Sequence, residues 1–186
     1  MKTKLLYKIR KTTGYSKEIK RIFHINYIEK PTLYLETSLF GFYFDETPRN
    51  VDKFETVNTL FNQIEQKKFL PVTSPITYYE LSKSPEPYKT SFLELLNNLK
   101  VNILKTKPEE VEILAAKYIK MKIIPEDFLN DARHIAYASI EKVDVMVTLN
   151  LEHIANEWAM RKINGINLQE GYLPLTVRTP MEVIIL

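Results

Sequence analysis

Short apolar runs alternate along this chain with longer segments of helical periodicity, and this alternation constrains the fold more than any other feature. The strand-like runs cover residues 32–36, 69–74, 101–106, 143–150 and 174–180. The helix-like segments cover residues 51–66, 75–84, 91–99, 108–121, 130–142 and 151–163. Strands separated by helices are too far apart for hairpins, so they form βαβ units. The sequence therefore predicts an α/β fold in which helices cover both faces of a parallel sheet.

Composition narrows the class of protein. The chain has 186 residues, 45% of them hydrophobic and 26% charged, which suits one globular domain with a short appendage. It has no cysteine, which excludes disulfides, thiolate zinc sites and a cysteine nucleophile. Its four glycines form no nucleotide-binding loop. No apolar stretch is long enough to span a membrane or to form a signal peptide, so we expect a soluble cytoplasmic protein that makes no use of a membrane.

Charge divides the chain at Pro31. Residues 1–30 hold nine lysines and arginines against two glutamates, a local net charge of +7, so residues 31–186 carry −4 of the whole-chain +3. A basic arm of this kind can hold a phosphate backbone. The alternatives are a frayed, disordered N-terminus and translated sequence that is not part of the native protein. We therefore expect an extension over residues 1–30 and a folded domain over residues 31–186.

Acidic and amide side chains follow the predicted strands. Glu36 ends the first strand, Thr148 and Asn150 end a later one, Glu80 lies just after the second strand, and Asp131 begins a helix that leads into the strand ending at Asn150. In open parallel sheets, ligands bind beyond the carboxyl ends of the strands, near the point where strand order reverses. Oxygen ligands without a His/Cys cluster suit Mg²⁺ or Mn²⁺ rather than Zn²⁺. The sequence therefore predicts a divalent-cation site at this edge.

Four segments in this order resemble a known family. "YLETS", "ITYYEL", "NDARHIAYAS" and "VDVMVTLN" with the following "HIAN" look like the PIN domain, and above all like the VapC-like toxins of type II toxin–antitoxin pairs. The resemblance spans residues 31–186 and implies a three-layer α/β/α fold with a parallel five-stranded sheet. It also implies a metal-dependent ribonuclease that cleaves phosphodiester bonds in RNA, forms a homodimer and is held inactive by a small cognate antitoxin.

The resemblance assigns roles position by position. Glu36, Glu80 and Asp131 match the three acids of the family and are the expected Mg²⁺ or Mn²⁺ ligands, and Asn150 stands where many members have a fourth acid. The residues expected to contact substrate or to support these acids are Thr37, Ser38, His134 and Thr148. Glu36 departs from the family's usual aspartate, and Asn150 supplies no negative charge. A catalytically silent PIN-like module that binds RNA or a protein is therefore the alternative function.

Each residue also has a purely structural interpretation. Glu36, Thr37 and Ser38 can end a strand and cap a helix, and Asp131 or Asn150 can occupy a helix N-terminus. Glu80 alone suits a solvated helix face, and His134 suits a hydrogen-bonded structural histidine. Four such coincidences at one predicted edge, in the order of the family, favour a shared site.

Overall fold

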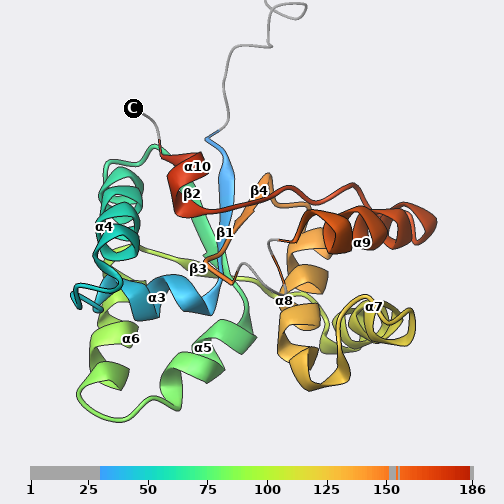
Figure 1. Cartoon of the computed structure of the whole chain (residues 1–186), viewed down its shortest axis with the longest axis horizontal. Helices are drawn as coiled ribbons and strands as arrows, with labels where there is room; N and C mark the ends of the chain where they lie inside the picture. Colours follow the sequence, from blue (N-terminus) through green and yellow to red (C-terminus); the bar gives the residue numbers. More distant parts are fainter. Residues whose placement is uncertain (1–29, 151–153, 155, 185–186) are drawn as a thin grey trace, which may run out of the picture. The chain divides into compact units, whose positions relative to one another are not determined.

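A computed structural model describes residues 30–150, 154 and 156–184. Its centre is a five-stranded sheet in the order β3-β2-β1-β4-β5, and every neighbouring pair in it is parallel (Figure 1). The strands are β1 (Thr32–Leu35), β2 (Leu70–Thr73), β3 (Asn102–Ile103), β4 (Val145–Val147) and β5 (Val177–Arg178). The prediction of an α/β fold with a parallel five-stranded sheet is therefore confirmed.

Each strand is shorter than the apolar run that predicts it. The run over 101–106 contributes only Asn102 and Ile103 to the sheet. Pro71 is tolerated inside β2, where it lies opposite Leu33, because β3 begins only opposite Val72. The backbone N–H that proline lacks is consequently not needed at that position of the ladder.

The helices match the predicted segments closely in most cases. They are α3 (Thr37–Tyr43), α4 (Val51–Glu65), α5 (Pro75–Ser82), α6 (Tyr88–Asn98), α7 (Pro108–Lys120), α8 (Leu129–Ile140), α9 (Glu157–Gln169) and α10 (Pro180–Val183), with a short 3₁₀ helix η2 (Glu126–Phe128). Helices α3 and α10 are additions to the predicted set.

The predicted helix over 151–163 is displaced in the described part of the chain. Helix α9 begins at Glu157 because the side chain of Asn156 caps it, accepting hydrogen bonds from the N–H groups of Trp158 and Ala159 at 3.1 and 3.2 Å. It continues to Gln169, beyond the predicted end. Residues 151–153 and 155 lie outside the described residues.

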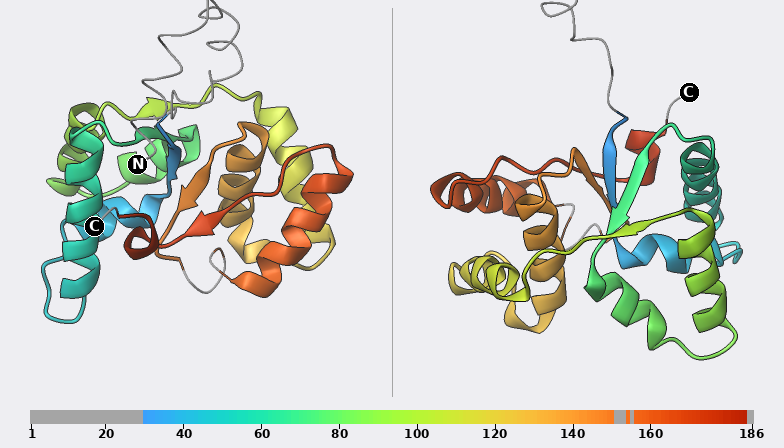
Figure 2. Two further views of the ribbon diagram at one scale, coloured as in Figure 1. Left: turned by 90° about the horizontal axis from the view of Figure 1, so that it is seen from above. Right: turned by 180° about the vertical axis from the view of Figure 1, so that it is seen from behind.

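Helices cover both faces of the sheet (Figure 2), and the side chains between helices and sheet form two apolar clusters. Leu33 and Leu35 of β1 pack with residues of α3, α4 and α6 on one face, whereas Tyr34 packs with residues of α7, α8 and α9 on the other. This alternation is the two-residue period of a strand that is buried on both faces. The observed arrangement is the expected α/β/α sandwich.

The strand order places a topological switch between β1 and β4. The chain runs outward from β1 through β2 to β3, and then returns to the other side of β1 with β4 and β5. Ligands of open α/β sheets bind beyond the carboxyl ends of strands at such a switch. Glu36 directly follows β1 and Thr148 directly follows β4, so the switch lies between two of the predicted site residues.

One expectation is not tested by the described residues, and a second is tested in part. The basic extension over residues 1–30 lies almost wholly outside the described residues, so the division of the chain at Pro31 stays a prediction. In the part of the chain that is described, no helix is both long and apolar enough to cross a membrane.

Candidate functional site

Glu36 is the most buried of the predicted acids, with 6% of its surface exposed. It caps α3: one carboxylate oxygen accepts the N–H of Ser38 at 3.1 Å, and the other accepts the hydroxyl of Ser38. That second oxygen also accepts the hydroxyl of Thr148 at 2.8 Å. Because a buried carboxylate is costly unless hydrogen-bonded, these three donors explain how Glu36 remains at the end of a buried strand.

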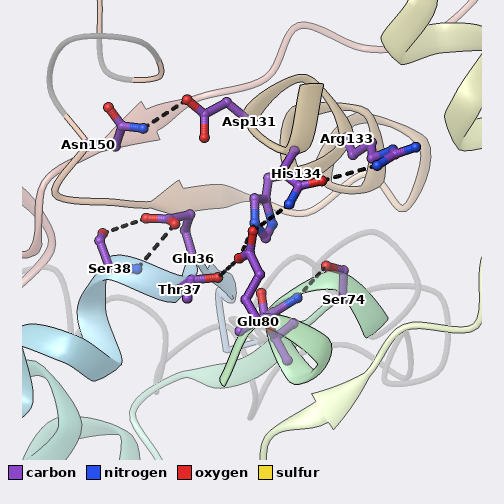
Figure 3. Close-up of polar contacts among 12 residues, drawn as sticks. Glu36, Thr37, Ser38, Ser74, Glu80, Asp131, Arg133, His134 and Asn150 are labelled. Atoms are coloured by element: carbon purple, nitrogen blue, oxygen red, sulfur yellow. Dashed lines mark hydrogen bonds and ion pairs between the residues drawn. The ribbon is translucent and has the colours of Figure 1, made fainter. Parts of the chain in front are cut away.

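Thr148 links Glu36 to a second acid. Its hydroxyl oxygen accepts the N–H of Asn150 at 2.9 Å while its proton goes to Glu36. The side-chain amide of Asn150 in turn donates to Asp131 at 3.0 Å (Figure 3). Asp131 lies in the first turn of α8, whose N-terminus reaches the carboxyl edge of the sheet. Hydrogen bonds therefore connect the ends of β1 and β4 with the start of α8.

Glu80 approaches the same edge from α5. One of its carboxylate oxygens accepts the hydroxyl of Thr37 and faces Nε2 of His134 at 3.2 Å, and the other accepts the amide of Asn130 at 2.8 Å (Figure 3). Burial acts to raise the pKa of Glu80. The hydrogen bond and charge interaction with His134, together with the hydrogen bonds from Thr37 and Asn130, outweigh that effect and hold the pKa below its ordinary value.

A buried chain of hydrogen-bonded side chains leads from Glu80 into the protein. His134 is 1% exposed, and its Nδ1 lies 2.6 Å from the hydroxyl of Tyr34. The Tyr34 hydroxyl lies 2.8 Å from the hydroxyl of Ser74, which also accepts the N–H of Thr77 and caps α5. Burial raises the pKa of Tyr34, so its hydroxyl keeps its proton.

The structure thus brings the predicted site residues to one edge of the sheet. We call this set the rim network, and its hydrogen bonds form two groups. The first group contains Glu36, Ser38, Thr148, Asn150 and Asp131. The second contains Glu80, Thr37 and His134, with Tyr34, Ser74 and Asn130 as further members. Asn130, Tyr34 and Ser74 were missed in the sequence. The adjacency of Asn130 to Asp131, and the position of Ser74 before a helix-starting proline, were signals for two of them.

The oxygen atoms of the rim network are of the types that bind Mg²⁺ or Mn²⁺. Their present arrangement, however, does not place three of the carboxylates around one point. Carboxylate, hydroxyl and amide oxygens are the ligands that Mg²⁺ and Mn²⁺ prefer. Among the described residues, no three His, Asp or Glu side chains lie close enough together to hold a metal ion. Glu36, Glu80 and Asp131 would have to turn toward a common point, with Glu36 giving up a hydroxyl donor.

Comparison with known proteins adds little beyond the fold. No protein-family model matches the sequence, and no curated protein matches it. One similar solved structure is the crystal structure of VapBC2 from Rickettsia felis bound to a DNA fragment from their promoter. It is 17% identical, the match covers 80% of this chain and 98% of that chain, and the TM-score is 0.48. At that level the similarity carries no functional conclusion, so the function is argued from the rim network.

Proposed function

We propose that this chain is a divalent-cation-dependent RNA endonuclease, with Glu36, Glu80 and Asp131 as the ligands of Mg²⁺ or Mn²⁺. The observation that carries the proposal is that three carboxylates from three separate elements lie along the carboxyl edge of the sheet. Glu36 and Asp131 are linked through Thr148 and Asn150 at the switch between β1 and β4, and Glu80 is hydrogen-bonded to Thr37, the residue after Glu36. An acid with a shifted pKa at a ligand-binding edge, as Glu80 is, is typical of functional sites. The order of the sequence motifs, which resembles that of VapC-like toxins, supports the same conclusion.

The residues of the chain have distinct tasks in this proposal. The pKa of Glu80 stays below its ordinary value in spite of burial, so the carboxylate keeps near neutral pH the negative charge that a cation needs. Asn150 orients Asp131, and Thr148 orients Glu36. A cation bound there would polarise the scissile phosphate and lower the pKa of an attacking water. A mechanism that uses the RNA 2′-hydroxyl would need an exposed general base, and His134 is too buried to serve.

RNA cleavage tests the proposal. The purified chain, incubated with a structured RNA, should produce fragments with Mg²⁺ or Mn²⁺ and none with EDTA. Asp131→Asn keeps the acceptor for Asn150 but removes a charge, and we expect it to slow cleavage by about 100-fold or more. The matched control is Asp127→Asn, an exposed aspartate in η2 just before α8, which should cleave like the wild type.

Two results would contradict the proposal. Cleavage that is equally fast with EDTA would remove the role of the cation, and equal rates for Asp131→Asn and wild type would remove the site.

A catalytically silent binding module is the second candidate, and one observation favours it. The carboxylate of Glu36 is committed to capping α3 and to Thr148, which is a structural use of the side chain. A hollow of about 590 Å³ beside α3 and α6 is lined in part by Phe44, Tyr88 and Phe92 and by none of the three site acids, and it offers a place for a protein partner. RNA that binds but is never cut, with either cation, would select this alternative.

The role as a toxin with a small antitoxin partner is a further part of the proposal. It rests on the resemblance of the sequence motifs, as does the homodimer. Expression of the chain should arrest bacterial growth, and Glu36→Ala should relieve the arrest. Arrest that persists at equal protein levels in Glu36→Ala would separate toxicity from this site.

A further inference from the structure

His134 is poorly placed to contact substrate and well placed to hold Glu80. Its ring is 1% exposed, and it packs edge-on against Tyr34 with the ring centroids 5.9 Å apart. Each ring nitrogen has one polar neighbour: Nε2 faces Glu80 at 3.2 Å, and Nδ1 faces the Tyr34 hydroxyl at 2.6 Å. The imidazole therefore bridges the acid on α5 and the first strand of the sheet.

We propose that His134, itself fixed by Tyr34, is a positioning residue that sets the orientation of the Glu80 carboxylate for cation binding. The inference deepens the proposed function and rests on it. An ionised carboxylate only accepts hydrogen bonds, so Nε2 of His134 carries the proton that points at Glu80. A ring held at one nitrogen aims the other, as outer partners of metal ligands do.

Tyr34 gives this support its rigidity. It is fully buried on β1, two residues before Glu36, so it lies on the same side of the chain as that acid. One strand therefore places Glu36 directly and Glu80 through Tyr34 and His134. The Tyr34 hydroxyl also forms a hydrogen bond with the hydroxyl of Ser74 at 2.8 Å. Ser74 caps α5, the helix that carries Glu80. The three contacts close a loop between β1, α5 and α8.

Two substitutions of His134 separate its two hydrogen bonds. The amide of His134→Gln reaches about as far as Nε2 and retains a donor for Glu80, whereas His134→Asn reaches only about as far as Nδ1 and retains the contact with Tyr34. Mn²⁺ affinity, measured by titration calorimetry, should fall by about 10- to 100-fold in His134→Asn. It should fall less in His134→Gln, which keeps the donor for Glu80 but loses the contact with Tyr34.

Tyr34→Phe removes the hydroxyl that contacts His134 but keeps the aromatic ring, so it creates no large cavity in the core. Removal of the hydroxyl frees Nδ1 of His134, and we expect Mn²⁺ affinity to fall by about tenfold. The matched control is Tyr118→Phe, because Tyr118 is equally buried and donates its hydroxyl to Asn167 within the layer of α7 and α9. That control should lose stability while its Mn²⁺ affinity stays the same.

A metal-free readout distinguishes positioning from a general loss of structure. In EDTA, a long-range ¹H–¹⁵N spectrum of the histidine rings should show a protonated Nε2 on His134, assigned by its loss in His134→Gln. An unprotonated Nε2 would overturn the inference, as would equal Mn²⁺ affinities for wild type, His134→Asn and Tyr34→Phe. Those outcomes leave the proposed function standing. A wild-type chain that binds no Mn²⁺ and cleaves no RNA would overturn both.

Discussion

Two polar clusters of the molecule, one at the edge of the sheet and one among the helices on one of its faces, differ in charge. The first is the rim network. The second, which we call the helix-layer network, joins Tyr118, Asn167 and Ser139: the Tyr118 hydroxyl donates to Asn167, whose amide donates to Ser139 at 2.9 Å. Ser139 then donates to the carbonyl of Ile135 at 2.8 Å. The helix-layer network is electrically neutral, whereas the rim network contains three carboxylates.

The difference indicates what each cluster is for. Neutral groups that satisfy one another fix the packing of helices at little cost. Carboxylates need several donors merely to remain buried, and apolar replacements are often as stable. A cluster that holds such groups at a ligand-binding edge is therefore better explained by function than by stability. Substitutions in the two networks should accordingly change different measured quantities.

The largest expected effect is on the rate of RNA cleavage when Glu80 of the rim network is replaced. Glu80→Gln retains the shape of the side chain but removes its charge, so we expect the rate of RNA cleavage to fall by about 100-fold or more. Glu94→Gln, on the exposed surface of α6, is the matched control and should cleave normally. Normal cleavage by Glu80→Gln would contradict the assignment of RNA cleavage to the rim network.

The next effect concerns stability alone. Asn167→Ala leaves the buried hydroxyl of Tyr118 without its acceptor, and we expect the free energy of unfolding to fall by about 1–3 kcal/mol. Chemical denaturation measures this loss. Cleavage per folded molecule should match the wild type below the unfolding transition. A selective loss of cleavage in the fully folded variant would show that the helix-layer network also serves the site.

The smallest expected effect is on the free energy of unfolding at acidic pH. The folded-state pKa of Glu80 lies below the ordinary 4.5, so its ionised form stabilises the fold above that pH, and the stabilisation is lost as pH falls through the folded-state pKa. In EDTA, the difference in unfolding free energy between wild type and Glu80→Gln should shrink below about pH 4.5. The difference between wild type and Asn167→Ala should show no such change, since no group in that network titrates there. Parallel curves for both variants would contradict the assignment of the shift to Glu80.

The sequence predicted the sheet and the meeting of the acids for a simple reason. Strands buried on both faces are continuous apolar runs, and the residues that follow parallel strands necessarily reach one edge. Helix α3 was not predicted because residues 37–43 contain Gly41 and no clear apolar stripe. The start of α9 was misplaced because Asn150 and Asn156 are both plausible caps, and sequence alone does not rank them.

Sequence patterns could not predict the contacts that hold Glu80 through His134 and Tyr34. Tyr34 occupies an apolar position of β1, where an aromatic residue reads as core, and His134 lies 100 residues further along the chain. Only the pairing of β1 with β4, and the packing of α8 beside it, brings the two together. Long-range contacts of this kind depend on the fold as a whole.

A crystal structure of the chain grown with Mn²⁺ tests the central claim most directly. The account predicts an anomalous scattering peak within coordinating distance of carboxylate oxygens from Glu36, Glu80 and Asp131, with Glu36 turned away from one of its hydroxyl donors. An Mn²⁺-saturated crystal that shows no peak at these three acids, or a peak only elsewhere, would contradict it.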